Sequence, residues 1–300
     1  RAFAIHLREK VTWHRVGVAL GLAITAVALY VLYRLLRGID PVEVLAAIKR
    51  TNPVNVAFAA LFVAAGYLTL TFYDYFALRT IGRKEVPYRT AAIAGFSSYS
   101  IGHNVGFTVF SGGTVRYRIY SSSNGLSAIE VAKICFIAGL TFWLGNITVL
   151  GLGFIIHPEA ASAVDQLPTA VNRFIGFMLL VALAVYVIWV SLAPRTFGRG
   201  GWSVTLPGGN LTLLQVAIGV IDLTCCAAAM YMLMPVKPEL DFISLSVIFI
   251  TATLLGFASH APGGIGVFDA TMLIALHEFD REELVGALLL FRLLYYIIPF

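Results

Sequence analysis

The chain has 300 residues, of which 59% are hydrophobic and only 12% are charged, and its formal net charge is +5. Soluble domains carry about 25% charged residues, so this composition excludes an ordinary cytosolic enzyme, a disulfide-stapled secreted module and a disordered chain. It predicts an all-α integral membrane protein that crosses the bilayer several times. The basic residues form short clusters between apolar runs, which is typical of topology signals rather than of a nucleic-acid-binding face.

The first uncharged run covers residues 16–33 and follows a basic stretch. It is longer than the apolar region of a signal peptide and ends at Tyr33-Arg34 rather than in small residues, so we expect an uncleaved span. The basic stretch 34–52 comes next, and we expect residues 41–50 to form a short amphipathic helix on the membrane surface. The chain begins without methionine and ends inside an apolar run, so we interpret it as a fragment of a longer protein.

Later apolar runs complete a prediction of about six spans. They cover residues 53–73, 134–156, 174–193, 211–234 and 284–300, the last with Arg292 near its middle. Lys and Arg gather in the N-terminal stretch and in the connections after the second and fourth spans, whereas the connections 157–172, 235–241 and 277–283 are acidic or nearly balanced. Positively charged loops stay in the cytoplasm, so the N-terminus is predicted to be cytoplasmic. The basic stretch 34–52 conflicts with this scheme because parity places it outside.

Two regions, residues 90–120 and 242–277, contain glycines that interrupt a simple span. Because each must leave and return on one side of the membrane, we expect two broken or re-entrant helices. Gly95 and Gly106 of the first region correspond to Gly256 and Gly266 of the second, at offsets of 161 and 160 residues. This suggests an inverted repeat with candidate halves 1–156 and 174–300, although Gly and Phe are common enough here for chance similarity. The break residues are Gly102, Gly106, Gly112, Gly113, Pro262, Gly263, Gly264 and Gly266.

Charged residues at membrane depth are the strongest functional signal, because each costs about 2.5–3.5 kcal/mol at a helix centre unless it is paired or hydrated. One interpretation is a set of snorkelling ends and structural ion pairs. The other is a polar path for a charged substrate. The candidates for that path are Asp74, Arg116, Asp222, Asp269 and Arg292, with His103, Asn104, Arg118 and His260 as secondary candidates.

Motifs for catalysis or cofactor binding are missing from the sequence. The six histidines show no i, i+4 pairing typical of zinc sites, and no G-x-S-x-G turn or P-loop occurs. Cys135, Cys225 and Cys226 all lie inside apolar stretches. We therefore predict no catalytic residue, no metal and no cofactor in this chain.

Three segments together resemble the N-terminal membrane region of the multiple peptide resistance factor family, MprF. They are the stretch from Ser100 to Phe107, the stretch from Ser111 to Arg118, and Ala261-Pro-Gly-Gly-Ile-Gly-Val-Phe-Asp269. A further match is the stretch from Arg292 to Pro299, so the similarity extends along the whole chain. The Pro-Gly-Gly-Ile-Gly motif alone is shared with wider membrane relatives.

The resemblance implies a bacterial inner-membrane protein with two activities. In the family, a cytoplasmic C-terminal domain transfers an amino acid, usually lysine, from aminoacyl-tRNA to phosphatidylglycerol. The membrane domain then moves the aminoacylated lipid to the outer leaflet, which confers resistance to cationic antimicrobial peptides, and family members form homodimers. For residues 1–300 we therefore expect a lipid flippase domain, with the transferase domain absent. The expected partners are the bilayer, phosphatidylglycerol and lysyl-phosphatidylglycerol, with aminoacyl-tRNA only through the missing domain.

The candidate charges fit such a head group, which carries two ammonium groups and one phosphodiester. We assign Asp74, Asp222 and Asp269 to the amines, and Arg116 and Arg292 to the phosphate, since guanidinium binds phosphate oxygens in bidentate fashion. The resemblance supports Asp74, Arg116 and Asp269, and Asp222 less securely. The alternatives are a transporter of another anionic lipid or isoprenoid carrier, a membrane anchor or dimerisation platform for the synthase, and, third, a membrane-embedded enzyme.

Overall fold

The computed structural model describes residues 26, 29–34, 36–106, 108–199 and 202–300, so most of the first predicted span lies outside the described residues. The chain is an all-α polytopic membrane protein. Its helices are α2 (Pro41–Arg50), α3 (Pro53–Thr80), α4 (Tyr88–Val105), α5 (Thr108–Asn124), α6 (Ala128–Ile156), α7 (Pro158–Asp165), α8 (Thr169–Leu192), α9 (Gly209–Leu233), α10 (Phe242–Ala258), α11 (Val267–Ala275) and α12 (Arg281–Arg292). Short elements complete the fold: strands β1 (Thr196–Arg199) and β2 (Trp202–Thr205), a 3₁₀ turn η1 (Pro262–Gly264) and a π-helical turn η2 (Leu293–Ile297).

Four of the described helices are long and apolar enough to cross a membrane: α3, α6, α8 and α9. They confirm the predicted spans 53–73, 134–156, 174–193 and 211–234, and each helix is between one and seven residues longer than its predicted span. Local signals fix where two of them start. Asn52 caps α3 ahead of Pro53, and Ser127 with Glu130 forms a capping box at the start of α6.

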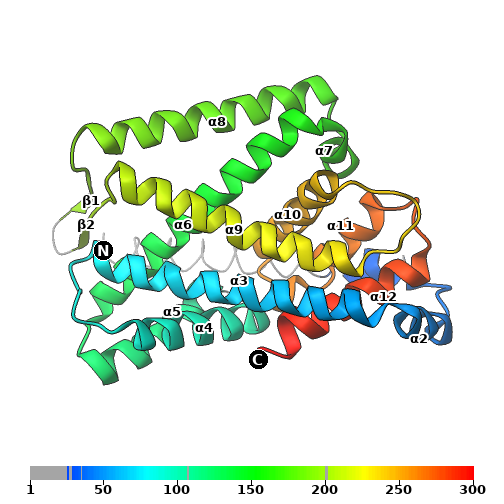
Figure 1. Ribbon diagram of the computed structural model, residues 1–300, viewed down its shortest axis with the longest axis horizontal. Helices are drawn as coiled ribbons and strands as arrows, with labels where there is room; N and C mark the ends of the chain where they lie inside the picture. The colour runs from blue at the N-terminus through cyan, green and yellow to red at the C-terminus, as the bar shows by residue number, and fades with distance from the viewer. Residues whose placement is uncertain (1–25, 27–28, 35, 107, 200–201) are drawn as a thin grey trace, which may run out of the picture.

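The two glycine-interrupted regions form helix pairs at opposite ends of the molecule. α4 and α5 pack against each other near one end of α3, whereas α10 and α11 lie toward its other end (Figure 1). The first pair turns at Gly106, whose φ is 79°, and the second turns through η1 and Gly266, whose φ is 89°. Each region is therefore a pair of short helices, as predicted, with the turns at Gly106 and at Pro262–Gly266. Gly102, Gly112 and Gly113, which we expected at the first break, lie instead within α4 and α5, where close packing of the two helices accounts for Gly102 and Gly112.

The sixth predicted span needs correction. Instead of one helix over residues 284–300, α12 has 12 residues, starts with Arg281 and two glutamates, and gives way to the π-helical turn η2. The chain end lies near the middle of the molecule's long axis (Figure 1). The change of geometry follows Arg292, whose side chain binds Asp269 and the carbonyl of Gly263 at the second break.

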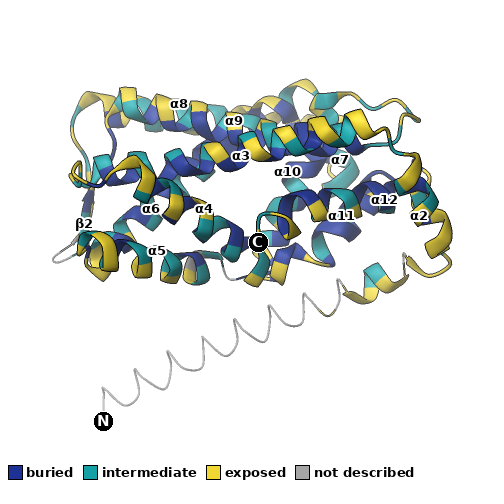
Figure 2. Cartoon of the chain, turned by 60° about the horizontal axis from the view of Figure 1, so that its bottom comes forward, coloured by how far each residue is buried: buried dark blue, intermediate teal, exposed yellow. Residues whose placement is uncertain are grey.

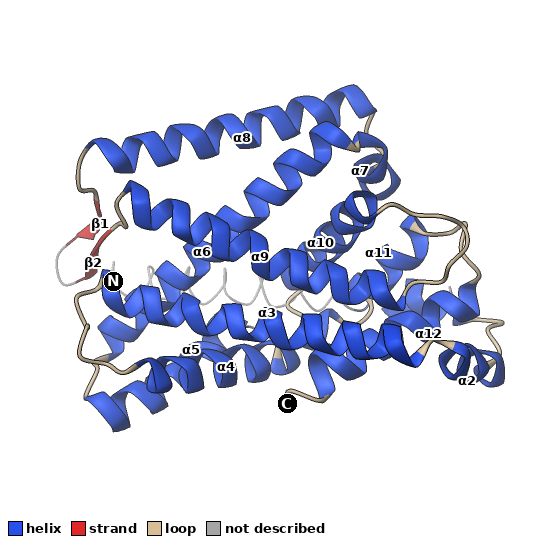
Figure 3. Cartoon of the chain, in the orientation of Figure 1, coloured by secondary structure: helices blue, strands red, loops and turns tan. Residues whose placement is uncertain are grey.

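α2 lies at the same end of the molecule as α7 (Figure 1). α2 confirms the amphipathic helix predicted over residues 41–50, with Val44 and Ala47 buried. Gly286 of α12 lies against α2, next to the side chains of Ile48 and Ala47. The opposite end carries the antiparallel pair β1–β2 (Figure 3), which the sequence interpretation missed, as it missed α7.

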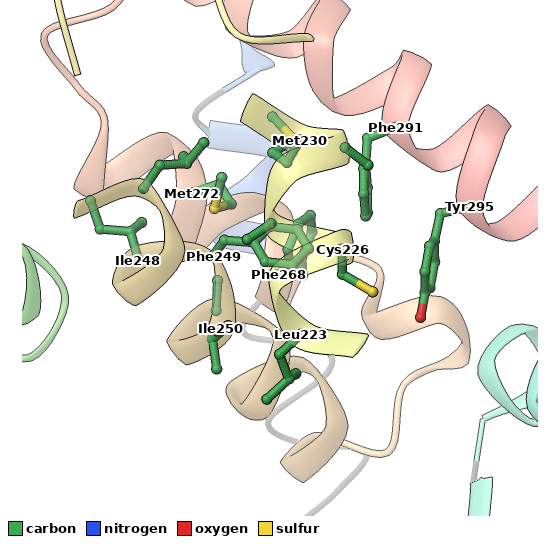
Figure 4. Close-up of a cluster of buried hydrophobic side chains, with 14 of the residues drawn as sticks. Leu223, Cys226, Met230, Ile248, Phe249, Ile250, Phe268, Met272, Phe291 and Tyr295 are labelled. Carbon is green, nitrogen blue, oxygen red and sulfur yellow. The ribbon is translucent and has the colours of Figure 1, made fainter. Parts of the chain in front are cut away.

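Apolar side chains from four elements form the main core near α9. Phe249 of α10, Phe268 of α11, Phe291 of α12 and Met230 of α9 point toward one another (Figure 4). The ring centroids of Phe249 and Phe291 are 5.2 Å apart with the planes at 82°. This core holds the second helix pair against the spanning helices.

A direct backbone contact joins α6 to α9. A Cβ added to Gly145 would lie 2.7 Å from the Cα of Gly219, so only glycine allows this approach. Nearby, Gln215 of α9 donates a 2.8 Å hydrogen bond to Thr141 of α6. By contrast, α8 keeps much of its surface exposed (Figure 2), with Phe174 64% exposed, as expected of a lipid-facing helix.

Candidate functional site

Asp74 and Arg116 form a fully buried ion pair between α3 and α5. Nε of Arg116 lies 3.0 Å from both carboxylate oxygens of Asp74, and Nη2 lies 2.8 Å from Oδ1. Tyr120, one turn further along α5, donates a 2.8 Å hydrogen bond to Oδ2. The ring of Tyr99 lies 4.7 Å from the guanidinium carbon. The pair therefore ties the first helix pair to a spanning helix through charge-assisted bonds.

Asp269 and Arg292 form a second pair at the other break. Nη2 of Arg292 lies 2.6 Å from Oδ2 of Asp269, and Nε lies 2.9 Å from Oδ1. Both side chains also bind the backbone of the break: Arg292 donates to the carbonyl of Gly263, and Asp269 accepts from the amide of Gly266. This pair fixes the shape of the break between α10 and α11.

Asp222 lies apart from both pairs, between α9 and α3. Its contacts are hydroxyls, with Tyr73 at 3.0 Å from Oδ2 and Thr69 at 3.2 Å from Oδ1. Within the part of the chain that the structure describes, it forms no ion pair with Lys, Arg or His. Among the described residues, four of the five predicted charges are thus paired with each other and the fifth has no cation partner.

The two breaks contact each other. A Cβ on Gly106 would lie 2.9 Å from the carbonyl oxygen of His260 and 3.1 Å from the nitrogen of Pro262. Beside this contact lies a central cavity of about 370 Å³. Its wall includes Gly106, His260, Gly264 and the Arg116 side chain. The interrupted backbone therefore borders a cavity, which is where such backbone is tolerated within a membrane.

A larger apolar groove of about 760 Å³ opens between α5 and α6. Phe110, Cys135, Gly139 and Trp143 line both the groove and the central cavity, so the two are neighbours. The groove runs along α6 from Ala128, at the end with the basic loops, to about its middle. A molecule with a charged head and apolar tails would match this arrangement of a cavity beside a groove.

The secondary candidates take different positions. His103 is buried between the rings of Phe257 and Tyr295, whose centroids lie 5.5 and 5.8 Å away, and it lines the central cavity. Asn104 donates 2.9 Å hydrogen bonds to the carbonyls of Ser100 and Tyr296 and so joins α4 to η2. Arg118 is exposed on α5, and His260 is exposed at the break with φ of 58°.

Sequence reasoning missed the phenols that complete the site. Tyr73, Tyr99 and Tyr120 bind or cover the buried charges. Only the position of Tyr73 beside Asp74 could have marked it, because tyrosine is common along this chain. The described residues contain no group of three or more His, Cys, Asp or Glu that could hold a metal ion.

The sequence of this chain matches a known protein family. The family model described as the lysylphosphatidylglycerol synthase transmembrane region matches residues 18–300. An uncharacterised protein of Synechocystis, slr0712, is 31% identical over 86% of this chain and 80% of its own length. The inner membrane protein YbhN of Escherichia coli is 29% identical over 92% of this chain and 86% of its own length.

A third relative is much longer than the matched region. The phosphatidylglycerol lysyltransferase of Staphylococcus aureus is 24% identical over 89% of this chain, but the match spans only 31% of that protein. All three relatives are bacterial, and together with the apolar helices they mark the chain as a bacterial membrane protein.

Proposed function

The chain belongs to the family of lysylphosphatidylglycerol synthase transmembrane regions, and from that premise we propose that it moves a phospholipid head group between the leaflets of the membrane. The observation that carries the proposal is the central cavity, bordered by both helix breaks and by a buried arginine, beside an apolar groove. A charged head group cannot cross bare hydrocarbon at a useful rate. A cavity that offers a guanidinium, two imidazoles and the backbone of the breaks lowers that barrier, while the acyl chains stay in the groove and the bilayer.

The first substrate we propose is lysyl-phosphatidylglycerol moving from the inner to the outer leaflet of the cytoplasmic membrane. The relationship to a phosphatidylglycerol lysyltransferase supports this choice. The direction follows if the end with Arg83, Lys84 and Arg195 faces the cytoplasm, as the positive-inside rule predicts. Resistance to cationic antimicrobial peptides would follow from the reduced negative charge of the outer leaflet. Homodimer formation and access to aminoacyl-tRNA through a transferase domain remain part of the same proposal.

Within this proposal the charged residues have separate roles. Arg116 contacts the phosphate, because it lines the cavity and its Nη1 takes no part in the bonds to Asp74. Asp74 holds that guanidinium in place. Asp269 and Arg292 keep the second break in shape beside the cavity, and Asp222 receives an amine.

Leaflet-resolved transport in proteoliposomes tests the proposal. Lysyl-phosphatidylglycerol in the outer leaflet is measured with a membrane-impermeant amine reagent. The wild-type protein is expected to redistribute the lipid, and Arg116→Ala to slow it at least about tenfold through loss of a charge-assisted contact. Arg89→Ala, the same change at an exposed site on α4, is the matched control.

Because Arg116→Ala leaves Asp74 buried without a cation, a second variant removes both charges. Asp74→Asn/Arg116→Gln is expected to fold and still to transport poorly. If the swapped pair Asp74→Arg/Arg116→Asp transports at the wild-type rate, the pair is purely structural and an anchoring role is favoured. The intact protein gives a further test through its Asp269→Ala variant. If this variant lowers the total amount of lysyl-lipid as much as the amount in the outer leaflet, the proposal is contradicted.

A second candidate is transport of another anionic lipid or an isoprenoid carrier. The higher identity to slr0712 and YbhN, which this chain matches over most of their length, favours it. Proteoliposomes that carry phosphatidylglycerol or an isoprenoid phosphate in place of the lysyl-lipid separate the two. Faster transport of either than of lysyl-phosphatidylglycerol would select the second candidate.

A further inference from the structure

The hydroxyl contacts of Asp222 indicate whether its carboxyl group is protonated or ionised in this fold. Thr69 has one hydroxyl proton but two oxygen neighbours, the carbonyl of Gly66 at 2.6 Å and Oδ1 of Asp222 at 3.2 Å. The shorter contact takes the proton, since a carbonyl can only accept. The Thr69 proton then gives Oδ1 at most a weak, shared contact, whereas a protonated Oδ1 that donates to the Thr69 oxygen makes a full hydrogen bond.

The remaining contact agrees with a neutral carboxyl group. Tyr73 donates to Oδ2, so a protonated Asp222 accepts on one oxygen and donates from the other. Asp222 is only 4% exposed, and the described residues provide no ion pair for it. A buried carboxylate without a cation takes up a proton rather than remain charged.

A small cavity joins Asp222 to His103. Its volume is about 40 Å³, and both side chains line it together with Tyr99 and Tyr295. A water molecule needs about 10–15 Å³ of such space, so one fits there. Nδ1 of His103 is buried without a hydrogen-bond partner among the described residues. His103 also lines the central cavity and therefore borders both spaces.

Other titratable groups near Asp222 come from three elements. α3 supplies Tyr67 and Tyr73, α9 supplies Cys225 and Cys226, and η2 supplies Tyr295 and Tyr296. Phenols and thiols are neutral at physiological pH. α4 adds Tyr99 and His103 to this set. His103 is therefore the one group in the set that can become a cation.

We propose that Asp222 is a proton-binding site that exchanges its proton for the ammonium group of the transported lipid. The proton leaves Oδ1 through a water to Nδ1 of His103, and the resulting imidazolium releases its Nε2 proton into the central cavity. The carboxylate left behind binds the incoming ammonium. One proton replaces a head group of net charge +1, so the exchange is electroneutral. This inference rests on the proposed function and adds its coupling to a proton gradient.

Infrared spectroscopy of the full chain in lipid tests the protonation directly. At neutral pH the wild-type protein is expected to show the carbonyl stretching band of a protonated carboxyl group. Asp222→Asn should remove that band and Asp74→Asn/Arg116→Gln should retain it, because Asp74 faces a guanidinium. Asn in place of Asp222 can accept from Tyr73 and donate to Thr69, so this variant is expected to fold. A spectrum without the band, or a band that Asp222→Asn leaves intact, overturns the inference.

Transport under a pH gradient tests the exchange. In proteoliposomes with the membrane potential clamped to zero, a gradient of about two pH units is expected to drive a leaflet ratio of lysyl-phosphatidylglycerol of up to about 100-fold. Asp222→Glu should keep this response, and Asp222→Asn should lose it. Wild-type transport that ignores the gradient refutes the exchange but leaves the proposed function standing. No wild-type transport under any gradient, with the infrared band present, refutes the proposed function while the protonated Asp222 remains.

Discussion

The two helix pairs use the same two residue types in different places. In the first, Arg116 lies on the returning helix α5 and binds Asp74 of α3, away from the turn at Gly106. In the second, Asp269 and Arg292 bind the break itself through Gly266 and Gly263. An aspartate–arginine pair therefore anchors one helix pair to the scaffold and holds the loop of the other. The position of an ion pair relative to the break decides its role more than its chemistry does.

The two ion pairs should differ most in the free energy of unfolding that is lost when each loses its carboxylate charge. Asp74→Asn leaves the Arg116 guanidinium buried without an anion, so we expect a loss of about 3–5 kcal/mol in the free energy of unfolding. Reversible unfolding in mixed micelles measures it. A loss below that of Asp269→Asn would contradict the assignment of Asp74 as the buried anchor.

The second pair is expected to respond more weakly and more locally. In Asp269→Asn, Arg292 keeps its bond to the carbonyl of Gly263 and is more exposed than Arg116, with a side-chain exposure of 14% against 6%. We expect a loss of about 2 kcal/mol, typical of a charge-assisted hydrogen bond. Amide hydrogen exchange should accelerate at Gly264 and Gly266. If exchange rises equally throughout α3, the pair does not act on the break.

The glycines at the breaks provide a third test. Gly106 has φ of 79° and ψ of −179°, a region that is essentially restricted to glycine, and its Cβ position is blocked by backbone of the other break. Gly106→Ala should cost about 2–3 kcal/mol. Gly263 has φ of 59° and ψ of 15°, with its Cβ position 3.5 Å from Arg292, so Gly263→Ala should cost about 1 kcal/mol. Equal losses would mean that the breaks do not press against each other.

A last pair of substitutions distinguishes a charged from a neutral carboxyl group. Tyr120→Phe removes a hydrogen bond to the ionised Asp74 and should cost about 1.5–3 kcal/mol. Tyr73→Phe removes one to the neutral Asp222 and should cost about 0.5–1.5 kcal/mol. The same unfolding assay measures both. A larger loss for Tyr73→Phe would indicate that Asp222 is ionised.

Elements defined by local patterns were predictable from the sequence. The apolar runs identified α3, α6, α8 and α9, and the amphipathic pattern of residues 41–50 identified α2. Glycine and proline marked both breaks. Hydropathy failed at α12, because the run that starts at Leu284 looks continuous while Arg292 has a partner 23 residues earlier.

Pairing between distant residues could not be predicted. The charged candidates were recognised by their cost at membrane depth, but nothing in the chain relates Asp74 to Arg116, 42 residues away. The neutral state of Asp222 was equally hidden, because it depends on which way the hydroxyl of Thr69 points. Such contacts arise only when α3, α5 and α9 are packed.

The glycine contact between α6 and α9 has a mechanical consequence. Neither Gly145 nor Gly219 has a side chain that can be compressed or change rotamer, so the two helices can pivot there but cannot approach further. If the central cavity opens, we expect α6 and α9 to rotate about this crossing and the two helix pairs to move apart. Spin-label distances should stay constant across the α6–α9 crossing and change across the contact between Gly106 and Pro262.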